Sequence, residues 1–246
     1  MIFLFILISS LFVSLVSIVG ILTIFSKKLQ SQNYASGFVS FAAGVMLSAA
    51  LLDVLPEALE LHPEPDLFLA IFGGILVFFF LERFVLWFHH HHGDHGTKPS
   101  AVLVLVGDAI HNLLDGLAIT AAFLVSPVLG LTTTLAIAAH EIPQEIADFS
   151  ILTAGGMSRT KALLWNFFSA LTSLVGAVLG YFFLRNLEEY IWIFLAFTGG
   201  MFLYIASSDL IPELHQDFKK DRRWQQTVPF ILGIVILFAL TKLIAE

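Results

Sequence analysis

Two short segments place ionisable side chains inside otherwise apolar runs. One reads GDAIHNLLDGLAI from residue 107, and the other reads HEIPQEIADF from residue 140. Residues three and four positions apart share a helix face, so each segment presents a polar stripe. The stripes contain Asp108, His111, Asn112 and Asp115 in the first segment, and His140, Glu141, Gln144, Glu145 and Asp148 in the second. Converging imidazoles and carboxylates bind divalent cations, and nitrogen donors favour zinc or iron over calcium or magnesium.

The composition places these stripes in a membrane protein. The 246 residues are 58% hydrophobic and 13% charged, with a mean hydropathy of +0.90. Eight apolar runs approach the ~20 residues that a helix needs to cross a bilayer: 2–25, 36–55, 67–88, 101–125, 128–154, 161–184, 190–212 and 227–245. We therefore expect an all-α transmembrane domain over residues 1–246, with the first run retained as a helix because it lacks signal-peptide features.

The polar stripes belong to the fourth and fifth runs, which only a few residues around Pro127 separate. These two helices must be antiparallel neighbours, which brings His111 and Asp115 level with His140 and Gln144. A charged residue at the bilayer centre costs ~3 kcal/mol, and a bound metal would compensate. Pro143 loosens the backbone beside the site by freeing a carbonyl. The alternative is that these groups only pair with one another between helices.

Lysine and arginine positions predict the orientation, because these residues are retained on the cytoplasmic side. Two of the twelve, Arg185 and Lys242, fall on one side of the predicted membrane. The other ten fall on the opposite side: Lys27, Lys28, Arg83, Lys98, Arg159, Lys161, Lys219, Lys220, Arg222 and Arg223. We expect an integral protein of the plasma (inner) membrane with both termini on the non-cytoplasmic side. The net charge of -7 is partly due to an acidic outer loop that would attract cations.

An internal repeat relates the second run to the seventh. GVMLSAALLDVLPE and GMFLYIASSDLIPE share a glycine, an aspartate and a Pro-Glu pair at a constant offset. Five crossings between them reverse their direction, which predicts an inverted 3+2+3 arrangement with the metal site between helices 4 and 5. The repeat places Asp53 and Glu57 at an outer entrance, and Asp209 and Glu213 on the inner side. Asp108 and Asp148 lie on the cytoplasmic side of the stripes and line a predicted exit.

A histidine-rich loop, residues 89–98, joins the third and fourth runs on the cytoplasmic side. Its histidines are His89, His90, His91, His92 and His95. Neutral imidazoles in such tracts bind Zn²⁺ or similar ions. The alternative is a polar tether with incidental affinity for metals.

The chain resembles the ZIP (Zrt/Irt-like) transporters of divalent metals along its whole length. HNLLDG and HEIPQE are similar to that family's HNxxxG and HExPxE patterns. The resemblance implies inward flow through a two-metal site, with one metal around His111, Asp115, His140 and Gln144. It implies a second metal around Asn112 and Glu141, which Asp115 and Gln144 bridge, and it suggests Met46 and Asn166 as lining positions. The chain departs from the common pattern at Gln144 and Ala147, which leaves the metal preference open.

Zinc is the substrate that we expect, with iron, manganese and cadmium left open. The expected partners are divalent metal ions and the lipid bilayer, and not nucleic acid; a homodimer is left open. HEIPQ also resembles the HExxH helix of zinc proteases, but Gln144 replaces its second histidine and Pro143 interrupts it. We therefore expect no enzyme activity, with an intramembrane hydrolase and a metal exporter as alternatives. Cysteine is absent, so no disulfide or thiolate ligand can form.

Overall fold

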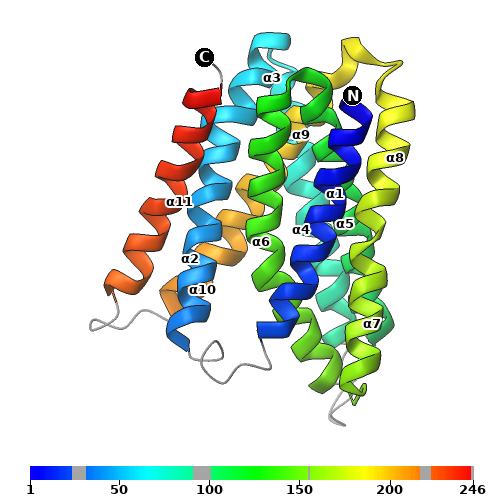
Figure 1. The fold of residues 1–246 in the computed structure, drawn as a ribbon, viewed down its shortest axis with the longest axis vertical. Helices are drawn as coiled ribbons and strands as arrows, with labels where there is room; N and C mark the ends of the chain where they lie inside the picture. Colours follow the sequence, from blue (N-terminus) through cyan, green and yellow to red (C-terminus); the bar gives the residue numbers. More distant parts are fainter. Residues whose placement is uncertain (24–31, 91–100, 155, 217–222, 245–246) are drawn as a thin grey trace.

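The computed structural model describes residues 1–23, 32–90, 101–154, 156–216 and 223–244, and nearly all of them are helical. The long helices run side by side along the long axis of the molecule (Figure 1). The predicted all-α architecture is therefore confirmed.

The described residues form eight consecutive helical segments, three of which are interrupted or continued by irregular turns. They are α1 (Ile2–Thr23); α2 (Gln32–Ala49) with π-helical η1 (Ala50–Val54) and α3 (Leu55–Leu61); α4 (Leu67–His90); α5 (Ala101–Val125); α6 (Pro127–Ala154); α7 (Arg159–Ala170) with α8 (Thr172–Leu184); the 3-10 turn η2 (Glu188–Tyr190) with α9 (Ile191–Tyr204), π-helical η3 (Ile205–Leu210) and α10 (Ile211–Gln216); and α11 (Arg223–Ile244). The predicted run 101–125 coincides with α5. The second run extends beyond its predicted end to Leu61, because η1 joins α2 directly to α3, the short helix that contains Pro56.

Five helical stretches of the described residues are long and apolar enough to cross a membrane. They are Ser36–Leu61, Val104–Val125, Arg159–Leu184, Glu188–Gln216 and Trp224–Lys242. α6 has spanning length too, but the polar residues of its second half lower its hydropathy. These spans are consistent with the predicted membrane protein.

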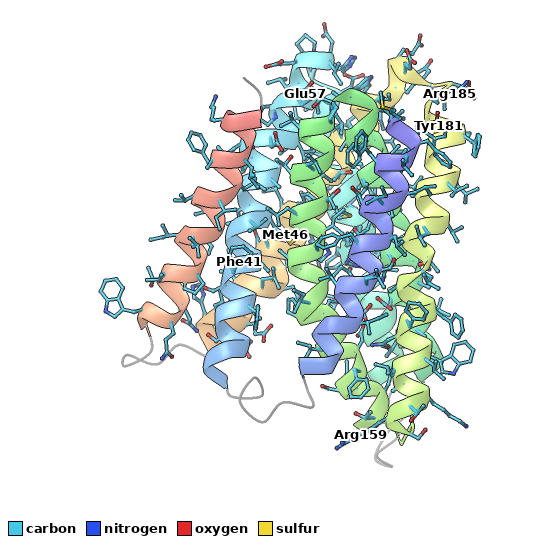
Figure 2. All side chains as sticks on the ribbon, viewed as in Figure 1. Phe41, Met46, Glu57, Arg159, Tyr181 and Arg185 are labelled. Atoms are coloured by element: carbon cyan, nitrogen blue, oxygen red, sulfur yellow. The ribbon has the colours of Figure 1, made fainter. Side chains whose placement is uncertain are left out.

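The two ends of the bundle can be told apart. The start of α1 and the end of α11 lie at the same end (Figure 1). Glu57 and Arg185 lie at that end as well, and Arg159 lies at the opposite end (Figure 2). Because both ends of the chain lie at the same end of the bundle, the chain runs along the bundle an even number of times.

The helices pack as two bundles. Bundle A consists of α1, α5, α6, α7 and α8, and bundle B consists of α2, α4, α9 and α11 with their short continuations η1, α3, η3 and α10. Within bundle B, α2 packs along α11 and α4 packs along α9, while α5 packs along α8 in bundle A. α6 of bundle A also lies against α2 of bundle B, and Figure 1 shows α6 between α1 and α2.

Glycines bring three helix pairs into backbone contact. At each crossing a glycine of either helix lies against a carbonyl oxygen of the other, where a Cβ atom would overlap the backbone. The pairs are Gly44 and Gly233 between α2 and α11, Gly74 and Gly200 between α4 and α9, and Gly116 and Gly176 between α5 and α8. Such small residues let helices approach closely where the hydrophobic effect does not drive them together.

Hydroxyl groups fix α5 against α7 and α8. Ser169 Oγ donates to the carbonyl of Leu105 (3.2 Å) and Thr172 Oγ1 donates to that of Ala109 (2.7 Å). One turn beyond Gly116, Thr120 Oγ1 lies 3.2 Å from the carbonyl oxygen of Ala177. These bonds satisfy polar groups inside the bundle and set the position of the helix that carries His111.

We predict that Gly74→Ala destabilises the protein more than Gly73→Ala. The added methyl of the first variant would overlap the carbonyl of Phe197, whereas that of the second would meet only a side-chain atom at 4.0 Å. Overpacking at a fixed crossing costs about 1–3 kcal/mol, and thermal unfolding in detergent measures the difference. Equal melting temperatures for the two variants would show that α4 and α9 can separate at no cost.

Candidate metal site

A tight connection sets the register of α5 and α6. α5 ends at Val125, and α6 begins at Pro127, a residue suited to the first turn of a helix. Ser126 Oγ accepts a hydrogen bond from the backbone N–H of Leu129 (3.1 Å), which caps α6. The two helices are antiparallel neighbours, as the sequence predicts.

Four buried side chains meet between these helices. His111 and Asp115 of α5 face His140 and Glu141 of α6, and one donor atom from each lies within 4.8 Å of the others. Their exposed fractions are 7%, 0%, 1% and 0% in that order. His111 Nε2 lies 3.1 Å from His140 Nε2. We call these four residues the cluster.

The separations within the cluster fit tetrahedral coordination. Zinc bonds of ~2.0–2.2 Å to nitrogen and oxygen put tetrahedral ligand atoms roughly 3.3–3.5 Å apart. His111 Nε2 lies 3.6 Å from both Asp115 Oδ2 and Glu141 Oε1. His140 Nε2 lies 3.7 Å and 3.6 Å from the same two oxygens. Shifts of a few tenths of an ångström would let all four atoms bind one ion.

A backbone contact orients the His140 ring. Its Nδ1 lies 3.1 Å from the carbonyl oxygen of Ala136, so Nδ1 carries the proton and donates it to that oxygen. A neutral imidazole has only one N–H, which leaves the Nε2 lone pair directed at the cluster. A hydrogen bond on the outer nitrogen of this kind is typical of histidines that bind metals.

The charges of the cluster balance a divalent cation. Two neutral imidazoles and two carboxylates sum to a charge of -2, and both carboxylates are fully buried. Burying such charges without a partner is costly. The donor set therefore suits Zn²⁺ or a similar ion in charge, in ligand type and in geometry.

Bundle B contributes aromatic rings around the cluster. The ring of Phe78 in α4 packs against the His111 ring, with ring centroids 5.1 Å apart. The ring of Phe202 in α9 packs near the His140 ring, with centroids 6.4 Å apart. Both phenylalanines are buried. The ligand atoms of the cluster therefore come from bundle A, and these two rings form apolar walls from bundle B.

A cavity of about 290 Å³ opens beside the cluster, between the two bundles. His111 lies on its wall with Asp108, Gln144 and Asp148 of bundle A. Glu82, Tyr204 and Asp209 line it from bundle B, and the Tyr204 hydroxyl donates to the Glu82 carboxylate. The cavity gives a cation a polar route to one side of the cluster.

The chain matches the family model described as ZIP Zinc transporter over residues 1–102 and 89–244. It belongs to the ZIP family. The members of this family are transporters and not enzymes, as the sequence motifs predict. Helices apolar enough to span a membrane agree with that membership.

Several curated ZIP proteins are similar to this chain. Zinc transporter ZIP13 of Pongo abelii is 36% identical over 217 residues, which cover 81% of the chain and 64% of that protein. Metal cation symporter ZIP8 of Homo sapiens is 30% identical over 280 residues, which cover 82% of the chain and 60% of that protein. Zinc transporter ZIP10 of Danio rerio is 40% identical over 159 residues, 62% of the chain and 18% of that protein. The chain spans less than two thirds of the length of each.

The remaining stripe residues of this ZIP chain surround the cluster. Asn112 is fully buried and donates through Nδ2 to Asp108 Oδ1 (2.9 Å). Asn166 of α7, also fully buried, donates to the backbone carbonyl of Glu145 (3.4 Å). Gln144 lies on the cavity wall together with His111 and Asp108.

The residues predicted along the pathway lie in different surroundings. Asp108, Asp148 and Asp209 line the cavity. Asp53 is buried and accepts a hydrogen bond from Thr132. The remaining predicted positions lie as follows: Glu57 is half-buried in α3, Glu213 is exposed in α10, Met46 belongs to the apolar core in the last turn of α2 (Figure 2), His89 and His90 end α4, and His91, His92 and His95 lie outside the described residues.

Sequence reasoning missed Glu82, Tyr204 and Thr132. Glu82 carried a usable signal, because it is an acidic residue within the apolar run 67–88. Tyr204 and Thr132 carried none, since tyrosine and threonine are common in membrane helices. Their roles depend on which residue of the other helix they face.

We predict that His140→Ala lowers the Zn²⁺ affinity of the purified protein on the order of 100-fold or more, because it removes a ligand at the centre of the cluster. Calorimetric titration in detergent measures the affinity. His62→Ala is the control, because His62 pairs with Asp66 in the turn after α3 and should leave this affinity unchanged. Equal Zn²⁺ affinity in the two variants would exclude the cluster as the binding site.

Proposed function

We propose that this chain carries divalent transition-metal ions, zinc foremost, across a membrane into the cytoplasm. The observation that carries this proposal is the buried, tetrahedrally spaced His111, Asp115, His140 and Glu141 set, with a cavity opening beside it. Relatives named as zinc transporters and metal cation symporters support it. Iron, manganese and cadmium remain candidate substrates, since the donor set also fits them.

The cluster exchanges water ligands for protein ligands as the ion moves. At the cluster the carboxylates neutralise the charge of the ion, and the apolar rings of Phe78 and Phe202 exclude water. An ion that moves inward then leaves through the cavity, whose wall includes Asp108 and Gln144. Release requires the reverse exchange, which is faster where ligands are neutral and few.

A second metal binds beside the first in this proposal. Asn112 and Gln144 provide amide oxygens, and Glu145 and Asn166 lie buried on the same side of α6. Asp115 and Gln144 would bridge the two ions. The Asn112 and Asn166 side-chain oxygens are buried without a hydrogen-bond partner among the described residues, which supports a cation nearby.

The chain crosses the membrane eight times as an inverted 3+2+3 repeat, with both termini outside. The two π-helical segments support the repeat, because Asp53 in η1 and Asp209 in η3 are 156 residues apart and precede matching prolines. Gly44 and Gly200 are separated by the same 156 residues, and each lies against a backbone carbonyl of another helix, that of Phe230 in α11 and that of Ile71 in α4. A homodimer is compatible with this arrangement.

The pathway runs from Asp53 and Glu57 at the outer entrance to an inner exit. Asp108, Asp148 and Asp209 line that exit, and Glu213 follows in α10, directly after η3. The five histidines of the stretch 89–98, two of which end α4, bind metal as it leaves, as a sensor or a relay. Counting bound Zn²⁺ before and after replacing them with serine separates their contribution from that of the helical site.

Metal uptake by sealed vesicles of known orientation tests the function. We expect inward flux of Zn²⁺ that competing Fe²⁺, Mn²⁺ or Cd²⁺ reduces, and no flux with Asp115→Ala inserted at equal density. Net flux in the opposite direction would identify an exporter. Normal uptake by the Asp115 variant would remove the cluster from the pathway.

We predict that Gln144→His binds Zn²⁺ more tightly and transports it more slowly. The new imidazole lies one turn from His140 on the same face and adds a nitrogen donor beside the cavity. Calorimetry should give a lower dissociation constant, and vesicle flux should give a lower maximal rate with a stronger preference for Zn²⁺ over Mn²⁺. Unchanged affinity together with unchanged selectivity would mean that Gln144 does not meet the metal.

A further inference from the structure

The two bundles meet differently at the two ends of α6. Towards the C-terminal end of α6, the cavity separates Asp148 from Tyr204 and Asp209 of bundle B. α6 also lies against α2 and η1, and Thr132, near the N-terminal end of α6, contacts Asp53 of η1. The cavity therefore reaches the cluster from one side, and exchange with the other side would require α6 to separate from η1.

A buried hydrogen bond closes that second end. Thr132 Oγ1 of α6 donates to Asp53 Oδ2 of η1, and the two residues are 0% and 9% exposed. The hydroxyl also lies near the carbonyl oxygens of Val128 (3.1 Å) and Leu129 (3.0 Å). It has one proton to donate, and a carboxylate is the stronger acceptor. The bond joins bundle A to bundle B across their interface.

At the matching position of the open end, no such hydrogen bond to Asp209 is found within the described part of the chain. Asp209 occupies in η3 the place that Asp53 occupies in η1, but it shares the cavity with the carboxylates of Asp148, Asp108 and Glu82. Like charges across the cavity oppose closure, while the hydrogen bond at the other end opposes opening. Both terms favour the arrangement with the cavity open.

We propose that the Asp53–Thr132 hydrogen bond is a latch that holds the second end closed and must break before the cluster can exchange ions with that side. The inference rests on the proposed transport function, because it names the step that limits access from the entrance. Asp53 thus has a second role beside that of an entrance ligand: while Thr132 is bound to it, the entrance is shut.

Thiol labelling at the two ends tests the latch. The chain contains no cysteine, so all labelling of a single-cysteine variant occurs at the introduced thiol. Leu129→Cys lies one turn before Thr132 on the same face, where the leucine is 2% exposed, and Ala147→Cys lies on the cavity wall. An impermeant maleimide reacts at position 129 only while the closed end is open.

We predict that Thr132→Val raises the labelling rate at position 129 roughly tenfold, the effect of losing a hydrogen bond to a charged group, without raising the rate at position 147. Thr132→Ser keeps the hydroxyl and should label at the unmodified rate. Thr133→Val is the matched control, since Thr133 is also fully buried and its Oγ1 has no partner among the described residues. Asp53→Asn should also raise the labelling rate at position 129. If Thr132→Val does not fold, the rate measured with Asp53→Asn tests the latch instead.

Equal labelling of Thr132→Val and Thr133→Val at position 129 would overturn the latch. Faster labelling at both positions 129 and 147 would also overturn it, because it indicates general loosening. The assay involves no metal flux. A selective rise in a chain that moves no metal would keep the latch and reject the transport function, whereas flux without the rise would reject only the latch.

Discussion

Two buried carboxylates beside two imidazoles are the constraint on which the rest of this structure depends. Asp115 and Glu141 are fully enclosed between α5 and α6, where charge is costly unless it is compensated. A cation held by all four side chains removes most of that cost. The chain must therefore keep two helices in one register, to within a few tenths of an ångström, inside a bundle that has little hydrophobic effect to hold it.

Backbone contacts provide that precision. Gly116 and Gly176 let α5 and α8 touch, and the hydroxyls of Ser169 and Thr172 fasten α5 to its neighbours. Ser126, the single residue between α5 and α6, caps α6. Because these contacts join the main chain either to main chain or to short hydroxyl side chains, they position His111 and His140 without long, flexible side chains. Rigid placement of the helices lowers the cost of arranging the ligands.

The boundary between the bundles has the opposite character. Phe78 and Phe202 contact the imidazoles through aromatic rings, which can slide or part more easily than ligand bonds. Polar groups across this boundary gather at its ends, with carboxylates around the cavity and one hydroxyl–carboxylate bond at the far end. Bundle A can thus keep its ligands together while its contacts with bundle B change. This separation of tasks suits a protein that must hold an ion and also release it.

The sequence by itself determined the helices, the polar stripes and the antiparallel pairing of α5 with α6. Hydrophobic runs, helical spacing and the short connection at Pro127 are local properties, and they brought His111, Asp115 and His140 together correctly. Tertiary structure alone decided that Glu141 lies with these three residues and that Gln144 lines the cavity. That choice depends on how α6 is rotated against α5, and helical periodicity leaves this rotation free within a broad polar stripe. The partnership of Asp53 with Thr132 likewise required the structure, because a threonine among three in a row gives no sign of which one faces another helix 79 positions away.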